Sequence, residues 1–319
     1  MKKSIIALAV AGAMTAPIVA QADATIYGRV HERVVFQEDQ DANIENAGAR
    51  FGVKGSSEMD SGLTAFYNIE MEFRGDRGSD RQSNTSRSSG ASDIQFRQLH
   101  AGVKGDFGKV TVGRFTNPYV DTYPADIYEG ESGVYQLAPY RIGNAVSYDS
   151  PNFGGFSASA AIIGEAEGDD STHEDVDGYV LKAKGEFGPV TVAVAYMDTD
   201  YGDATIANGE DDSELASIGV SYDAHNVYVA LSYEEDDVSD TDVTDFSAAY
   251  KVGKTTFGLG YAYKDETGDA EESRALLGVY HQLGGSADVY TELARYDETD
   301  SANNDTDYNR FSVGYRVKF

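Results

Sequence analysis

Residues 65–74 read AFYNIEMEFR, and their side chains alternate in character from one residue to the next. The apolar series is Ala65, Tyr67, Ile69, Met71 and Phe73, and the residues between them are Phe66, Asn68, Glu70, Glu72 and Arg74. Successive side chains of a β-strand point to opposite faces of the sheet. The stretch therefore predicts a strand with one apolar face and one polar face.

The same period of two recurs along the chain, for example from Ile26 to His31 and over residues 246–252 and 257–263. One face is apolar and rich in tyrosine, whereas the other carries Gly, Ser, Ala and isolated charges, which would make a poor core. A soluble sandwich turns its apolar faces inward, but a transmembrane barrel turns them towards lipid. Because a sheet in lipid must leave no free edge, the pattern predicts an all-β, antiparallel, closed transmembrane barrel.

The number of alternating segments sets the width of the barrel. We predict 16 strands, which is enough to leave an aqueous channel, whereas side chains would fill a barrel of about 8 strands. The predicted strands are 24–36, 47–57, 62–74, 93–105, 109–115, 141–150, 155–164, 177–187, 190–198, 213–223, 226–235, 243–252, 255–264, 273–282, 287–297 and 308–319.

The connections alternate between short turns and long polar loops, as an up-and-down barrel requires. The short turns are centred on residues 106–108, 187–189, 252–254 and 283–285. The longer loops are 75–92, 164–177, 199–212, 236–242 and 298–307.

The N-terminus has the features of an export signal. Lys2 and Lys3 precede an apolar stretch, and Ala20-Gln21-Ala22 offers the small-x-small pattern of a cleavage site. We therefore expect residues 1–22 to be removed and residues 23–319 to form a single barrel domain. The chain has no cysteine, so it cannot form a disulfide framework.

Several segments in order resemble the general diffusion porins of the Gram-negative outer membrane. They are Ala24-Thr25-Ile26-Tyr27-Gly28-Arg29, Arg50-Phe51-Gly52-Val53-Lys54-Gly55, the run from Lys104 to Gly108 leading into Val112-Gly113-Arg114, and the run from Arg141 to Pro151. The resemblance spans the mature chain. It implies an outer-membrane channel for passive diffusion of ions and small hydrophilic solutes. It also implies that Phe319, at the C-terminus, is the signal read by the barrel-assembly machinery.

The longest connection, about residues 115–140, has no strand pattern, and such long connections in compact folds are usually functional. It resembles the porin constriction loop, a long third loop that folds into the lumen. The resemblance implies that some of its acids, Asp121, Asp126, Glu129 and Glu131, face wall arginines across the narrowest point.

Alternation places Arg29, Arg50, Arg74 and Arg141 on the lumen side of their strands. Arg114 aligns with a wall-arginine motif of the family, but its alternation is ambiguous unless a bulge intervenes. Opposed charges at a narrow point create a transverse field that orients dipolar solutes.

Other functions remain as alternatives. A sugar-selective channel on the same barrel would line its narrowest part with aromatic residues. The connection contains four, Tyr119, Tyr123, Tyr128 and Tyr135, so this alternative stays open. A surface adhesin or receptor is a further alternative, and it would have a plugged lumen. We expect no enzyme, because no nucleophile–base constellation is evident. We expect no metal site and no cofactor, because the five histidines are scattered. Nothing basic suggests nucleic acid.

The net charge of −29 is concentrated in the proposed loops, near residues 165–177, 198–214 and 234–245. Salt screens charges beyond about 8 Å, so this surplus does not decide ion selectivity at the pore. The expected partners are a homotrimer, latched through residues 75–92, and outer-membrane lipid. Lipopolysaccharide is a further expected partner, contacted through divalent cations held by loop acids.

Overall fold

The computed structural model describes residues 23–73, 94–131, 133–164, 176–199, 212–268 and 270–319. Within these ranges the chain forms seventeen β-strands and one short 3-10 helix, η2 (Pro118–Thr122). The strands are β1 (Asp23–Gln37), β2 (Asn43–Asn46), β3 (Ala49–Glu58), β4 (Thr64–Phe73), β5 (Ile94–Gly105), β6 (Gly108–Thr116), β7 (Arg141–Asp149), β8 (Phe156–Gly164), β9 (Val176–Phe187), β10 (Val190–Thr199), β11 (Ser213–Ala224), β12 (Val227–Asp236), β13 (Thr241–Val252), β14 (Thr255–Glu266), β15 (Ala270–Gly284), β16 (Ala287–Thr299) and β17 (Asp305–Lys318). No helix in the described part of the chain has the length and apolar character needed to cross a membrane.

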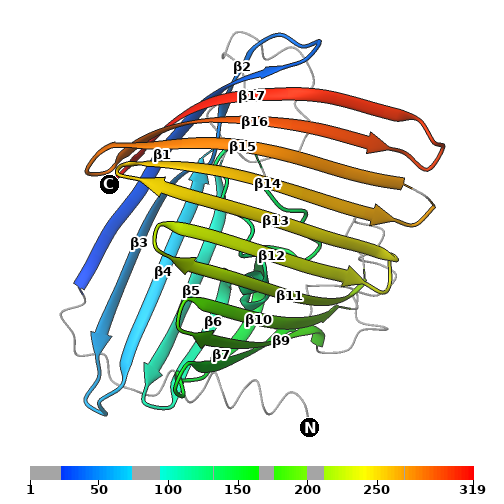
Figure 1. The fold of residues 1–319 in the computed structure, drawn as a ribbon. Helices are drawn as coiled ribbons and strands as arrows, with labels where there is room; N and C mark the ends of the chain where they lie inside the picture. The colour runs from blue at the N-terminus through cyan, green and yellow to red at the C-terminus, as the bar shows by residue number, and fades with distance from the viewer. Residues whose placement is uncertain (1–22, 74–93, 132, 165–175, 200–211, 269) are drawn as a thin grey trace, which may run out of the picture.

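The strands close into a ring. Neighbouring strands pair antiparallel along the chain, and β17 pairs with β1 in a register that runs from Arg29 opposite Lys318 to Gln37 opposite Arg310. Figure 1 shows this seam as blue β1 beside red β17. Strands β2 and β3 both pair with β1 and together make one wall strand. The sheet is therefore a closed antiparallel barrel of 16 strands, and this prediction from the sequence is confirmed.

The break between β2 and β3 is the one departure from the predicted strand pattern in the described residues. The side-chain oxygen of Asn46 accepts the backbone N–H groups of Gly48, at 3.0 Å, and Ala49, at 2.9 Å. Gly48 has a φ of 96°, a left-handed conformation that glycine adopts without steric cost. The Asn46 turn therefore separates β3 from β2, a short strand at residues 43–46 that lies outside the predicted strand 47–57.

The two faces of the wall differ as the alternation predicts. On β12, Leu231 and Tyr233 are exposed on the outside, whereas Ser232 and Glu234, which point the other way, are buried. The same division recurs on β16, where Leu293 is exposed and Glu292 is buried. The apolar surface therefore faces outward and the polar surface inward, which suits a wall between lipid and water.

The main apolar cluster involves the connection after β6 rather than a conventional core. Tyr119 and Tyr123 pack with Val180, Met197 and Leu215 of strands β9, β10 and β11. Helix η2 contacts the same strands.

A glycine on β11 permits the close approach of this helix. A Cβ atom at Gly219 would lie 2.5 Å from the carbonyl oxygen of Thr122. Only a residue without a side chain leaves room for the backbone of the helix at this distance.

Some predictions concern residues outside the described ranges. The export signal over residues 1–22 and the latching loop over residues 75–92 both fall there, as does Arg74.

Candidate functional site: charged side chains on the inner face

Arg50 and Arg97 project from the inner face of β3 and β5 towards two glutamates of β4. Arg50 lies 3.6 Å from Glu70. Arg97 lies 2.8 Å from Glu70 and forms a second, short ion pair with Glu72. These four residues, called the wall cluster below, place two cations and two anions side by side on the barrel wall.

A β-bulge explains why Arg97 joins this cluster. Glu70 lies opposite Gln98, whereas the next residue, Met71, lies opposite Phe96, so Arg97 is the extra residue on β5. A bulge re-aims a side chain relative to simple alternation. Alternation alone therefore cannot assign Arg97 to a face.

Glu129 forms ion pairs with two arginines of the wall. Its carboxylate lies 3.9 Å from Arg29 of β1 and in a short contact with Arg316 of β17. Arg316 is also 3.1 Å from Asp288 of β16. Glu129 is thereby tied to the barrel on both sides of the β1–β17 seam.

Glu131 makes a deeper set of contacts. It is only 3% exposed and pairs with Arg33 at 3.2 Å and Arg310 at 3.4 Å, and it accepts the hydroxyl of Tyr296 at 2.7 Å. Glu45 of β2 contacts the same two arginines, at 2.7 and 3.2 Å. Two acids are thus bridged by two arginines, which compensates the burial of Glu131. Residues 129–131 are called the loop tip below.

The backbone of the loop tip is held by one carboxylate of β16. Glu292 Oε1 accepts the N–H of Glu129 at 2.8 Å and the hydroxyl of Tyr280 at 2.7 Å. Its Oε2 accepts the N–H groups of Gly130, at 3.0 Å, and Glu131, at 2.6 Å. Hydrogen bonds to an ionised acceptor are stronger than neutral ones, so Glu292 is a firm anchor.

Two further carboxylates hold the rest of the connection. Glu234 of β12 accepts the Tyr123 hydroxyl at 2.6 Å and the N–H groups of Leu137 and Ala138 at 3.1 and 3.3 Å. Asp245 of β13 accepts the N–H of Tyr135 at 3.1 Å. The connection is therefore fastened to strands β12, β13 and β16 by carboxylate side chains that accept hydrogen bonds from its backbone N–H groups.

The remaining predicted acids have different surroundings. Asp121 pairs with Lys182 of β9 at 2.6 Å, away from the arginines. Asp126 is solvent-exposed and lies near the carboxylates of Glu129 and Glu292. Desolvation, followed by the negative charges of Glu129 and Glu292, raises the pKa of Asp126 to about 6.

The predicted arginines divide into groups. Arg29 and Arg50 lie opposite each other in register on the inner face and take part in the ion pairs above. Arg141 stacks on Tyr140, with 4.9 Å from its guanidinium to the ring centroid, and lies within electrostatic range of Arg97 and its two glutamates.

Arg114 is placed elsewhere. It pairs in register with Leu99, whose side chain is 48% exposed on the outer face, and its Nε donates to the carbonyl of Phe96 at 3.2 Å. The irregularity that the sequence left open lies in the β6–β7 pairing next to Arg114, where Asn144 of β7 has a φ of 48°. It leaves Gly113 and Phe115 on the inner face, so Arg114 is directed outward.

Sequence reasoning missed several of the charged residues that form these contacts. Arg33 could have been found, because it shares the alternation of Arg29 and His31 on β1. Arg97 could not, because of its bulge. The sequence around Glu292 and Glu234 does not indicate that they hold the connection, because their partners Glu131 and Leu137 are 161 and 97 residues away in the chain.

The four tyrosines of the connection do not line an open surface. Tyr119, Tyr123, Tyr128 and Tyr135 are all buried between the connection and the wall, and Tyr119 is fully inaccessible. Burial also raises the pKa of Tyr123 above its usual range, with the Glu234 carboxylate as the next cause. These rings therefore act as packing groups and offer no aromatic track to a sugar.

Phe319 closes the seam of the barrel. Its backbone N–H donates to the carbonyl of Gly28 at 3.1 Å, and its carbonyl accepts the N–H of Gly28 at 3.0 Å. The ring is exposed on the outer face and lies against Gly28. The C-terminal residue thus extends the β1–β17 ladder by one pair.

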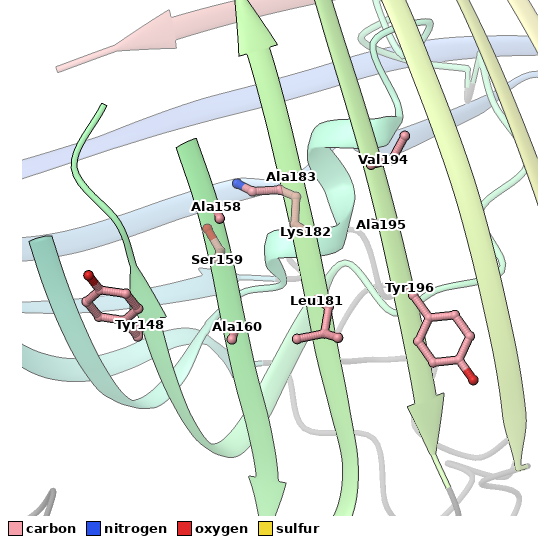
Figure 2. Close-up of a pocket in the computed structure, with 10 residues that line it drawn as sticks. All are labelled: Tyr148, Ala158, Ser159, Ala160, Leu181, Lys182, Ala183, Val194, Ala195 and Tyr196. Atoms are coloured by element: carbon pink, nitrogen blue, oxygen red, sulfur yellow. The ribbon is translucent and has the colours of Figure 1, made fainter. Parts of the chain in front are cut away.

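The outer face carries a shallow apolar depression across β7–β10. Ala158, Ala183 and Val194 lie in register, and their small side chains leave a volume of about 510 Å³ beside Leu181 and Tyr196. Figure 2 shows these residues, with Lys182 and Ser159 on the same strands. By alternation the last two belong to the inner face.

Comparisons with known proteins agree with this architecture. Residues 7–301 match the family model described as Gram-negative porin. The chain is 26% identical over 262 residues to the outer membrane porin protein OmpD of Salmonella typhimurium, covering 74% of this chain and 70% of that protein.

Solved structures share the fold. An anion-selective porin from Comamonas acidovorans superposes with a TM-score of 0.74 and 21% identity, covering 94% of this chain and 100% of that chain. The trimer form of OmpT from Vibrio cholerae gives a TM-score of 0.69 and 19% identity, covering 93% of this chain and 99% of that chain.

Proposed function

The chain belongs to the Gram-negative porin family and is an outer-membrane diffusion channel, and from that premise we propose that residues 115–140 form its constriction. The observation that carries the proposal is the anchoring of this segment, which leaves the wall after β6, by Glu234 and Asp245 on the adjacent strands β12 and β13 and by Glu292 on β16. A segment that leaves the wall at β6 and is held on the inner face at β12, β13 and β16 crosses the lumen and narrows it.

The charged groups beside the constriction act as its filter. The wall cluster and Arg141 carry charges on the wall, and the loop tip with Asp126 carries charges on the connection. The field between fixed charges orients dipolar solutes as they pass, while an apolar solute gains nothing to offset its lost hydration. The channel therefore passes ions and small hydrophilic solutes without a dedicated binding step.

A substrate-selective channel is the weaker alternative. Sugar selectivity needs aromatic faces exposed at the waist, and the four tyrosines of the connection are buried. General diffusion is therefore the function that the geometry supports best.

Planar-bilayer recording of the purified protein tests this filter. Combined replacement of Arg50, Arg97 and Arg141 by alanine should shift the reversal potential in a salt gradient towards cation selectivity, because three positive charges leave the wall. The matched control is Arg295→Ala, which removes a charge exposed beside Asp297 and Asp307. An unchanged permeability ratio in the triple variant would contradict the proposed filter.

The outward direction of Arg114 supports a homotrimer as the working assembly. An arginine facing lipid costs up to about 2–4 kcal/mol at the bilayer midplane and less towards the interfaces, and a contact with a neighbouring subunit would relieve this cost. Light scattering of the detergent-solubilised protein should give a trimer whose dissociation temperature falls in Arg114→Ala. A trimer of unchanged stability in that variant would leave Arg114 outside the interface.

Carboxylates on the outer face near the long loops suit contact with lipopolysaccharide through divalent cations. They are Asp198, Glu214, Glu235, Asp242, Asp265 and Glu271, one on each strand from β10 to β15 and close to one level by register.

Phe319, as the exposed terminal residue, is proposed as the feature recognised by the barrel-assembly machinery. Chelator-sensitive co-purification of lipopolysaccharide checks the first proposal, and assembly of Phe319→Ala in cells checks the second.

A further inference from the structure

A half-open pocket lies on the inner face, apart from the arginines. It is bounded by helix η2 and by strands β4, β5, β6, β7 and β9, and it has a volume of about 300 Å³. None of the residues that line it belongs to the wall cluster or to the loop tip. It is called the side pocket below. A volume of this size is at the small end of ligand-binding pockets.

The side pocket contains two ion pairs from four different segments. Lys182 of β9 lies 2.6 Å from Asp121 of η2, and Lys109 of β6 lies 2.9 Å from Asp149 of β7. Asp149 is also oriented by the Ser159 hydroxyl, which donates to it at 2.6 Å. Two ammonium groups and two carboxylates thus face one small volume, so its formal charge is balanced.

The other lining groups are mixed, and the apolar ones include two phenylalanines. Phe66 and Phe115 flank His100, with ring centroids 6.2 and 6.3 Å apart in edge-to-face contacts. Val120 of η2 also lines the volume. The His100 ring is held by a contact of 3.2 Å between its Nδ1 and the carbonyl of Arg114. The side pocket therefore presents charges of both signs beside a mixed lining that includes four apolar side chains, Phe66, Phe115, Pro118 and Val120.

We propose that the side pocket binds small zwitterions with an apolar body, that is, neutral α-amino acids. The carboxylate of such a molecule would contact Lys109 or Lys182, its ammonium group Asp149 or Asp121, and its side chain the two phenylalanines. A dicarboxylate would meet two resident acids, and a diamine would meet two resident lysines, so both are opposed by like charges. The inference rests on the proposed function, because the open channel supplies the route to the side pocket.

Binding there would be weak and fast. Each lysine already has a carboxylate partner, so a bound amino acid exchanges one ion pair for another rather than satisfying bare charges. A ligand held in this way beside the main path should raise the noise of the ion current more than it blocks it.

Three probes of the same carbon skeleton separate the charge requirements. They are L-leucine, 4-methylpentanoate, which lacks the ammonium group, and isoamylamine, which lacks the carboxylate. With the full-length protein in planar bilayers, L-leucine should increase current noise at concentrations about tenfold lower than either analogue. Saturation-transfer NMR of the same detergent-solubilised protein measures binding without requiring conduction.

Lys109→Ala and Asp149→Asn test the site without touching residues 117–140, and each should weaken the response to L-leucine about tenfold. The matched control is Lys184→Ala. Lys184 lies on the same face of β9 as Lys182 but pairs with Glu186 at 3.4 Å and does not line the side pocket. The control should respond like the unaltered protein.

The possible failures are distinguishable. Normal salt conductance with no L-leucine effect in noise or NMR overturns the side-pocket inference and leaves the channel function intact. Equal effects of the three probes, or equal loss in Lys184→Ala, also overturn it, because they indicate a general lumen effect. Absence of salt conductance overturns the channel function, and the NMR comparison then still decides whether the side pocket binds L-leucine.

Discussion

Replacing Glu292 by glutamine should free the loop tip while leaving the barrel intact. In the unaltered protein its two carboxylate oxygens accept three backbone N–H groups and one tyrosine hydroxyl. Glutamine keeps the shape of the side chain but replaces one oxygen with an NH₂ group, which cannot accept. If nitrogen takes the Oε1 position, the Tyr280 hydroxyl can rotate to accept, but the N–H of Glu129 loses its acceptor. If nitrogen takes the Oε2 position, two N–H groups lose theirs.

The smallest penalty is therefore one unsatisfied buried N–H, which costs about 1–3 kcal/mol, plus the loss of charge assistance in the other bonds. We expect the free energy for opening the loop tip to fall by about 2–4 kcal/mol in total. Since about 1.4 kcal/mol corresponds to a factor of ten, the amides of residues 129–131 should exchange roughly 30- to 700-fold faster.

Hydrogen exchange with mass spectrometry on the folded protein measures this directly. The control is Glu298→Gln on the same face of β16, where the carboxylate accepts only the Tyr308 hydroxyl, at 3.3 Å. Exchange of residues 129–131 should be unchanged in that variant. Equal exchange in Glu292→Gln and the unaltered protein would refute the idea that this carboxylate holds the loop tip.

The other predictions concern the charge of Asp126, the packing of helix η2 against Gly219, and the hydrogen bond from the Tyr123 hydroxyl to Glu234. Because the pKa of Asp126 is raised to about 6, this group is neutral at pH 5 and charged at pH 7. The reversal potential should therefore move towards cation selectivity as the pH rises, and Asp126→Asn should abolish that movement. Gly219→Ala should displace helix η2 at a cost of about 1–3 kcal/mol and alter single-channel conductance. Gly258→Ala should be tolerated, since a Cβ there meets its nearest atom at 3.6 Å. Tyr123→Phe removes the hydroxyl that donates to Glu234, so exchange protection over residues 137–138 should fall by about 1–2 kcal/mol, and unaltered protection would contradict that anchor.

The strands were predictable because every second side chain of a barrel strand faces lipid and is apolar, whereas the side chains between them face the lumen and are polar or small. Apart from β2, which was not predicted, each predicted strand end lies within three residues of the observed one over the described part of the chain. The Asn46 turn was missed because its cause is a local side-chain hydrogen bond rather than a change in alternation. The direction of Arg97 was hidden for a similar reason, since the bulge beside it is a property of the pairing of two strands.

The acids of the connection could be named from the sequence, but their partners could not. Asp121 and Glu129 are only 8 positions apart, yet one pairs with β9 and the other with β1 and β17. Such partners depend on how the connection runs across the barrel, which no local pattern encodes. The outward direction of Arg114 likewise required the register with Leu99.

The hydrogen bonds from the loop-tip backbone to Glu292 have a consequence for the evolution of the channel. It binds N–H groups that every residue except proline possesses, so the side chains at positions 129 and 131 can be exchanged without removing this anchor. Position 130 is restricted to glycine by space, because a Cβ there would lie 2.8 Å from the Glu292 carboxylate. Natural variants can thus inherit the same loop path while changing the charges it displays, and a lineage can adapt its permeability without rebuilding the barrel.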